Sequence, residues 1–110
     1  MSGSSGGGGG GGHTSADTSC EDLVIDTQLN SPKEEVVVKL KLGELLDVSL
    51  ETRAGTDVIL VKHKGKVAGS VTSPLSGRLR KCLQKGIEYT AEVKKLVGGQ
   101  VHVRIAAKDE

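Results

Sequence analysis

Lysine and arginine are the residue types with the clearest chemistry in this chain, and they gather in one stretch. Residues 62–95 contain nine Lys and Arg side chains against two Glu, although the whole chain carries a net charge of only +1. Charge of one sign attracts phosphate groups and gives binding that weakens with salt. We expect the end of a strand pair and one helix face to form a basic groove. The predicted nucleic-acid-binding residues are Lys62, Lys64, Lys66, Ser70, Thr72, Arg78, Lys81 and Lys85.

No set of residues in the sequence predicts catalysis or metal binding. His13, His63 and His102 are too far apart to form a metal motif, and the cysteines lack C-x-x-C spacing. Ser73 is interpreted as a helix cap, because no nucleophile motif surrounds it. We therefore expect no catalytic residue, no metal, no cofactor and no enzymatic activity.

Cys20 and Cys82 are not expected to form a disulfide. Small secreted domains that depend on disulfides usually contain more cysteines than these two. Cys82 is predicted to face the core and Cys20 to be an exposed thiol. The sequence shows no signal peptide and no apolar run of membrane-spanning length. These features predict an intracellular protein, cytoplasmic or nuclear, with no membrane partner.

Composition divides the chain into a tail and a domain. Residues 1–33 are rich in Gly and Ser, include the run Gly6–Gly12 and are acidic, which predicts a disordered tail. Residues 34–107 are predicted to form one small domain. The short apolar patch Leu23–Ile25 within the tail is either an edge strand or a weakly sticky element of the linker. An acidic tail beside a basic domain also suggests that the tail competes for the basic face.

The domain shows the period-two alternation of half-buried strands. Because the chain has no Phe or Trp and one Tyr, Tyr89, the core must be aliphatic. Turns are expected at Arg53–Gly55, Gly65 and Val97–Gln100, and Gly69 within a strand predicts a bulge. The predicted strands are residues 36–42, 45–51, 58–61, 66–71, 88–94 and 101–105.

One helix is expected, over about residues 74–85. Ser73 is a favoured cap, Pro74 a favoured first residue and Gly86 a favoured C-terminal residue. Gly77 inside this helix suggests a close approach to another group. The core face of the helix is predicted to consist of Leu75, Leu79, Cys82 and Leu83. The predicted fold class is mainly β with one helix: a small, partly open OB/SH3-like β-barrel of about six antiparallel strands.

The stretch from Asp57 to Gly86 resembles the core of HIRAN-type domains. The matching residues are Asp57–Ile59, the glycine-containing strand Lys66–Val71, the three helix leucines and Gly86, within a similarity that covers about residues 45–95. The resemblance implies an OB-like barrel that binds single-stranded DNA or DNA ends. The aromatic residues that stack on bases in such domains are missing here, so binding would depend on Lys and Arg.

The sequence thus predicts a module that binds single-stranded DNA or RNA electrostatically. The alternatives are a protein-interaction module that uses an exposed strand edge or the strand at residues 36–42, and an ordinary solvated charged surface. The sequence does not indicate an oligomeric state.

Overall fold

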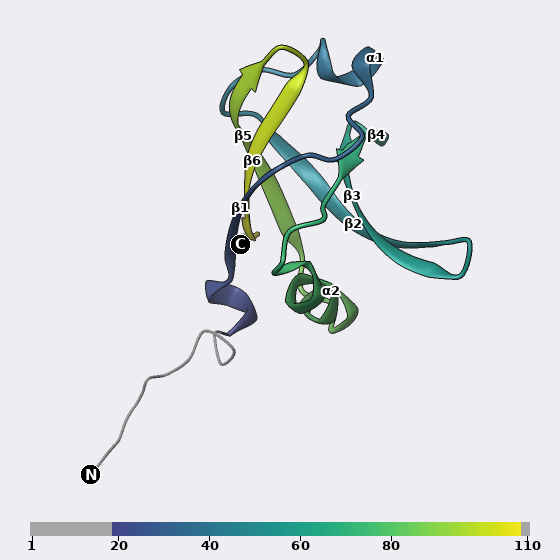
Figure 1. Cartoon of the computed structure of the whole chain (residues 1–110). Coiled ribbons are helices and arrows are strands. Elements are labelled where there is room, and N and C mark those ends of the chain that lie inside the picture. Colours follow the sequence, from purple (N-terminus) through teal and green to yellow (C-terminus); the bar gives the residue numbers. More distant parts are fainter. Residues whose placement is uncertain (1–18, 109–110) are drawn as a thin grey trace.

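The computed structural model describes residues 19–108, which form one antiparallel sheet of six strands with short helices at its ends (Figure 1). The order of strands in the sheet is β1-β6-β5-β2-β3-β4. This confirms the predicted fold class of a small, mainly β domain built like a partly open barrel. The elements are η2 (Cys20–Asp22), β1 (Val24–Gln28), α1 (Glu34–Val37), β2 (Leu45–Arg53), β3 (Thr56–His63), β4 (Lys66–Ser70), α2 (Ser76–Gln84), β5 (Tyr89–Val97) and β6 (Gln100–Ala107).

Three tight turns join the hairpins, and both central residues of each have positive φ. They are Ala54–Gly55, Lys64–Gly65 and Gly98–Gly99. Turns of this kind match the right-handed twist of the strands that they connect. The predicted turn positions are therefore confirmed, and Figure 1 shows the β2–β3 hairpin as an arm that projects from the body of the sheet.

The two outer strands of the sheet meet through the segment that follows β1. The Asn30 N–H donates to the Ser70 carbonyl at 2.8 Å, the Ser70 N–H donates back at 2.9 Å, and the Lys33 N–H donates to the Ala68 carbonyl at 2.8 Å. These bonds connect the chain beyond β1 to the outer edge of β4. The six strands consequently curl into a barrel, with the contact between Asn30 and Ser70 as its seam.

Gly69 lies at this seam, in the strand where a bulge was predicted. The register between β3 and β4 shifts beside it, so Val61 pairs with Gly69 and Lys62 with Val67. A Cβ on Gly69 would lie 2.9 Å from the Cβ of Leu29 and 3.1 Å from the Asn30 carbonyl oxygen. Only glycine lets the two segments approach this closely.

The core is aliphatic apart from Tyr89, as composition requires. The Tyr89 hydroxyl donates to the Cys20 carbonyl, and burial raises the pKa of Tyr89, so this group stays protonated as a donor. The most deeply buried large side chains are Ile25, Leu29, Leu46, Val61, Leu79, Val93, Val101, Val103 and Ile105.

The prediction of a strand over residues 36–42 was wrong. Residues Glu34–Val37 form α1, which buries the neighbouring side chains of Val36 and Val37, whereas Val38 is 72% exposed. The segment is held to β4 at Lys33 and to β5 by the Gly43 N–H, which donates to the Val93 carbonyl at 2.7 Å. The chain between these anchors crosses the end of the barrel, where no strand is available for pairing.

The tail was predicted to extend to residue 33, but the folded part begins earlier. β1 pairs with β6 along its whole length, and Leu23, Ile25 and Leu29 are buried. Of the two interpretations of Leu23–Ile25, the edge strand is therefore correct. Residues 1–18, with the glycine run and His13, lie outside the described part of the chain.

The prediction that the cysteines stay unpaired was also wrong. Cys20 and Cys82 form a disulfide with a Cα–Cα distance of 5.7 Å, although 62 positions separate them in sequence. The docking of residues 19–29 on the barrel brings Cys20 to α2, which sequence spacing alone does not reveal. Cys82 faces the core as predicted. No helix in the part of the chain described by the structure is long and apolar enough to cross a membrane.

The predicted helix is present, but it starts later than expected. Ser73 lies before it, where its hydroxyl accepts from the Leu75 N–H at 3.1 Å, and α2 runs over Ser76–Gln84. Leu79 and Cys82 are buried as predicted, but Leu75 at the helix start is 42% exposed. Gly86 ends the helix with φ +90°. Gly77 has no close neighbour, since its added Cβ would lie 3.6 Å from the Arg80 Nη2.

Gly69→Ala should destabilise the domain by roughly 1–3 kcal/mol, because the new methyl group meets backbone and a buried leucine at the seam. Gly77→Ala is the matched control, and it should be neutral or stabilise by up to about 1 kcal/mol, because it adds helix propensity and its new methyl group makes only an ordinary van der Waals contact. Urea unfolding of both variants measures the difference. Equal effects of the two substitutions would show that the seam is not tightly packed.

Replacing both cysteines, as Cys20→Ala with Cys82→Ala, should lower the free energy of unfolding by about 2–4 kcal/mol, because the long loop is no longer closed in the unfolded chain. Reductant should lower the stability of the parent protein by a similar amount and leave the double variant unchanged. Urea unfolding with and without reductant tests this. If reductant affects both proteins equally, the crosslink is not the cause.

Candidate functional site

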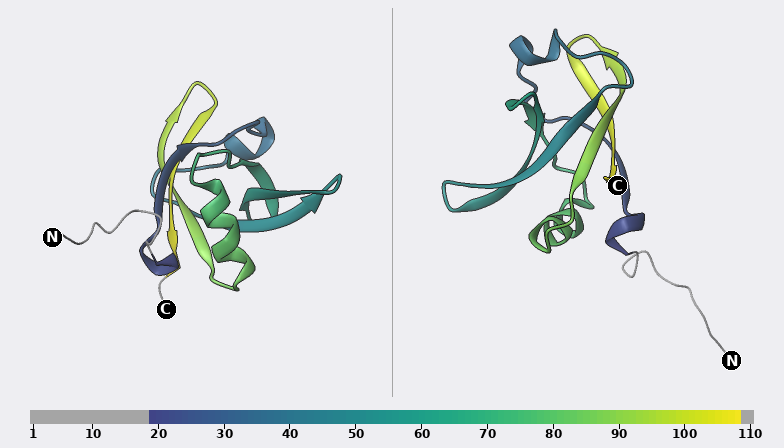
Figure 2. Two further views of the ribbon diagram at one scale, coloured as in Figure 1. Left: turned by 60° about the horizontal axis from the view of Figure 1, so that its bottom comes forward. Right: turned by 180° about the vertical axis from the view of Figure 1, so that it is seen from behind.

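The predicted basic groove is divided between opposite ends of the barrel. Lys64 and Lys66 lie at the β3–β4 turn beside α1, whereas Lys81 and Lys85 lie on and just after α2. Figure 1 and the right-hand view of Figure 2 place α2 at the end of the sheet away from α1. The structure therefore does not combine the strand lysines and the helix lysines into one surface.

Two predicted site residues have structural contacts. Lys62 on β3 forms an ion pair with Glu51 on β2, although its register partner across the β2–β3 pair is Asp47. The Ser70 hydroxyl donates to the Asn30 carbonyl at 3.3 Å and supports the seam.

The remaining predicted residues lie nearer α2. Thr72 is exposed at a separate hollow of about 260 Å³, with Ser76 and Arg80. Arg78 is half-buried, and its positive charge lowers the pKa of Tyr89 against the larger effect of burial. It was predicted to share one helix face with Lys81 and Lys85, but these two lysines are exposed whereas Arg78 is partly buried.

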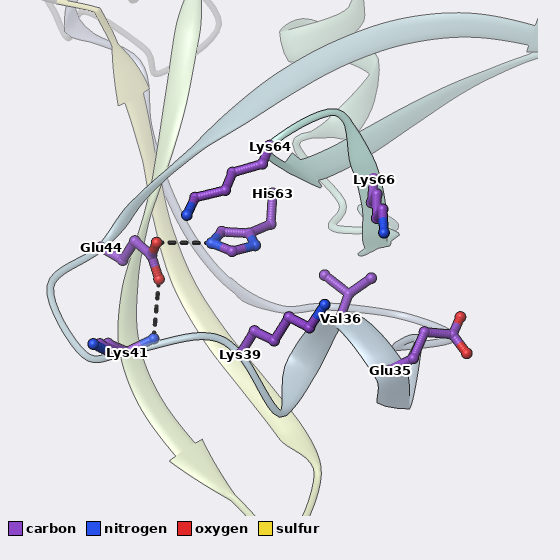
Figure 3. A pocket seen from close by; sticks show the side chains of 8 residues that line it. All are labelled: Glu35, Val36, Lys39, Lys41, Glu44, His63, Lys64 and Lys66. Atoms are coloured by element: carbon purple, nitrogen blue, oxygen red, sulfur yellow. Dashed lines mark hydrogen bonds and ion pairs between the residues drawn. The ribbon is translucent and has the colours of Figure 1, made fainter.

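The strongest candidate site is a pocket of about 380 Å³ between α1 and the β3–β4 turn, which we call the basic pocket (Figure 3). One wall comes from α1 and the loop after it, and the other from the turn and the strand ends beside it. The residues that line it are Glu35, Val36, Lys39, Lys41, Glu44, His63, Lys64 and Lys66.

A Glu–His pair lies in the wall of the basic pocket. The Nε2 of His63, at the end of β3, lies 2.8 Å from Glu44 Oε2, while Glu44 Oε1 accepts from the Lys41 N–H at 3.1 Å. The hydrogen bond with His63 is the main reason that the pKa of the Glu44 carboxyl lies below its usual value of 4.5, and the charge of Lys64 adds to this effect. Glu44 is therefore a fixed anion that orients the imidazole ring.

His63 is the one buried polar or charged side chain in the described core, with 8% of its surface exposed. Its second nitrogen, Nδ1, points away from Glu44 toward the interior of the pocket in Figure 3. No group within residues 19–108 forms a hydrogen bond with Nδ1. The ring therefore presents a nitrogen with unused hydrogen-bonding capacity to whatever enters the pocket.

Positive charge dominates the rest of the lining. No carboxylate of the described residues lies within ion-pair distance of Lys39, Lys64 or Lys66, and the same holds for Lys41. Figure 3 shows the Glu35 carboxylate directed away from His63. Four lysines thus contribute to the lining, although the Lys41 side chain points away from His63 in Figure 3, and the one inward carboxylate is already engaged by His63.

The sequence predicted two of these lysines, Lys64 and Lys66, and missed Lys39 and Lys41. Both missed residues lie in the predicted strand at residues 36–42, which does not form. His63 was considered as a metal ligand and was set aside, because the three histidines are far apart in sequence. The one signal in the sequence was its position between lysines next to a turn glycine, which does not reveal burial.

No family model matches the chain, and no curated protein or solved structure matches it either.

Glu44→Gln should remove part of the acid sensitivity of the domain. A carboxyl with a lowered pKa in the folded state stabilises the fold above its unfolded pKa, and this contribution is lost as the pH falls through the folded value. The free energy of unfolding should therefore fall less in Glu44→Gln than in the parent between about pH 5 and pH 3. Urea titrations across this range measure it, with the exposed Asp47→Asn as control. Parallel pH profiles for parent and Glu44→Gln would contradict the prediction.

Proposed function

We propose that the protein is a nucleic-acid-binding module that holds the phosphates of single-stranded DNA or RNA at the basic pocket and has no catalytic activity of its own. The observation that carries the proposal is the group of four lysines without carboxylate partners around a concave site. Ammonium groups in this arrangement attract phosphate and release counterions when it binds.

The composition supports an electrostatic mode of binding. With one tyrosine, which is buried, and no Phe or Trp, the domain has no exposed aromatic ring on which a base could stack. Affinity must then come from phosphate contacts, which carry little sequence information. The likeness to HIRAN-type and OB-like domains belongs to this proposal and rests on the glycine and leucine pattern alone.

The proposal includes an intracellular location, since nucleic acid is abundant there. The Cys20–Cys82 disulfide bears on this point because such bonds persist mainly in oxidising compartments. In the cytoplasm or nucleus we expect the pair to be reduced in part, with the N-terminal segment then held by the β1–β6 pairing and the contacts at the seam.

A protein-interaction module is the second candidate, favoured by an open strand edge. β2 pairs with β5 only through Leu45–Asp47, so the described structure leaves the β5-facing edge of the β2–β3 arm without a strand partner. Val38, Leu42 and Leu45 are also about two-thirds or more exposed at the nearby end of the barrel. An added strand along this arm is the mode of binding that this candidate predicts.

Charge reversal in the basic pocket should abolish most nucleic-acid binding. In the triple variant Lys39→Glu, Lys64→Glu and Lys66→Glu, the affinity for a short single-stranded oligonucleotide should fall at least about tenfold, and the slope of log affinity against log salt by about two. Fluorescence anisotropy at several salt concentrations measures both quantities.

The matched control reverses Lys81 and Lys85 at the other end of the barrel, which should change affinity much less. If both variants lose affinity equally, the pocket is not the site and binding is diffuse. If the parent does not bind at low salt, the nucleic-acid proposal is wrong and the open strand edge becomes the first candidate.

A further inference from the structure

The basic pocket has features that an internal phosphate of a strand does not require. The internal phosphodiesters of a strand bind along rows of exposed lysines, and each diester carries one negative charge. Here a buried imidazole lies at the pocket wall, with Nδ1 directed inward and Nε2 held by Glu44. A buried, oriented donor or acceptor indicates recognition of one particular group rather than of a continuous backbone.

We propose that the basic pocket binds a terminal phosphate monoester of a nucleic-acid strand, with His63 Nδ1–H donating to one of its oxygens. This inference rests on the proposed function and names the part of the ligand that the site recognises. A monoester carries nearly two negative charges at neutral pH and three strong acceptor oxygens. It therefore matches a site with several ammonium groups and one imidazole better than a diester does.

The Glu44–His63 pair explains how the imidazole becomes a donor to phosphate. Glu44 accepts the proton on Nε2, so an oxygen at Nδ1 requires the ring to carry both protons. The resulting imidazolium lies between two anions, the carboxylate and the phosphate. Hydrogen bonds of this charged type are about twice as strong as neutral ones.

The charged groups around the ring fit this arrangement. Lys64 and Glu44 lie on the Nε2 side, while Lys39 and Lys66 reach the space in front of Nδ1 (Figure 3). Four lysines against two glutamates leave the lining with a net positive charge before His63 is counted. A dianion neutralises this excess, whereas a single diester would leave part of it.

The size of the pocket also suits a chain end. Its volume of about 380 Å³ is that of a small-molecule site rather than a long channel. Val36 of α1 supplies an apolar part of the lining. A terminal phosphate can enter while the rest of the strand leaves over the exposed lysines.

The test compares oligonucleotides of one sequence that carry a 5′-phosphate, a 3′-phosphate or no terminal phosphate, by fluorescence anisotropy with the full chain. We expect one phosphorylated form to bind about tenfold more tightly than the unphosphorylated form, and the better end identifies the source of the monoester. Inorganic phosphate should compete for this added affinity. Equal binding of all three forms would overturn the inference while leaving the proposed function intact.

His63→Asn should remove the preference for phosphorylated ends, and His102→Asn, on β6 outside the pocket, should retain it. Because a buried substitution can unfold the domain, the parent protein provides a second measurement. In long-range nitrogen–proton spectra of the complex with the phosphorylated oligonucleotide, His63 Nδ1 should give the signal of a protonated nitrogen. An unchanged His63 signal at saturation would overturn the assignment.

A phosphoserine peptide is a further ligand in the test, and it distinguishes nucleic-acid binding from binding to a phosphorylated protein. It should bind at least about tenfold more weakly than the preferred oligonucleotide, because it lacks the additional phosphates that reach the surrounding lysines. Equal affinity for the peptide would overturn the assignment to nucleic acid. Loss of all binding, including that of the unphosphorylated oligonucleotide, would instead reject the proposed function itself.

Discussion

The close backbone pairing between Asn30 and Ser70 is the constraint on which the rest of the structure depends. It joins the outer strands of the sheet and so determines the curvature of every strand between them. It also fixes the start of α1, because Lys33 bonds to Ala68 three residues further along the chain. This pairing requires glycine at position 69, because a Cβ there would collide with Leu29. One residue without a side chain therefore allows the barrel to close.

The strands were predictable because the alternation of their side chains is a local pattern. The closure of the barrel was not predictable, because it depends on contacts between segments far apart in the sequence. Alternating side chains and the glycine turns at Gly55, Gly65 and Gly99 identified five of the six strands. Residues 36–42 alternate equally well but form no strand. The chain on either side of them is bonded to different strands, because Lys33 bonds to β4 and Gly43 bonds to β5. Conversely, β1 has a weak pattern and becomes a strand because β6 offers it a partner.

The candidate site was predictable only in part for the same reason. Lys64 and Lys66 follow from one hairpin, whose turn the sequence identifies. Lys39 and Glu44 join them only because α1 and the loop after it cross the end of the barrel. Charge counting along the chain grouped Lys64 with Lys81 and Lys85, which the fold places at the opposite end. The net charge of a stretch indicates the class of ligand, but the position of the binding site depends on how the fold brings the charged residues together.

The two ends of the barrel differ in how they are held together. At the α2 end, a disulfide and the hydrogen bond from Tyr89 to Cys20 fix the N-terminal segment, so this end is crosslinked. At the α1 end, Lys64 adopts φ +52°, and His63 is buried with one nitrogen unused in the described structure. The positive φ of Lys64 costs free energy that a glycine at this position would avoid. Departures from local preference of this kind concentrate at functional sites, and together with the buried His63 this is the physical reason for proposing a site at the α1 end.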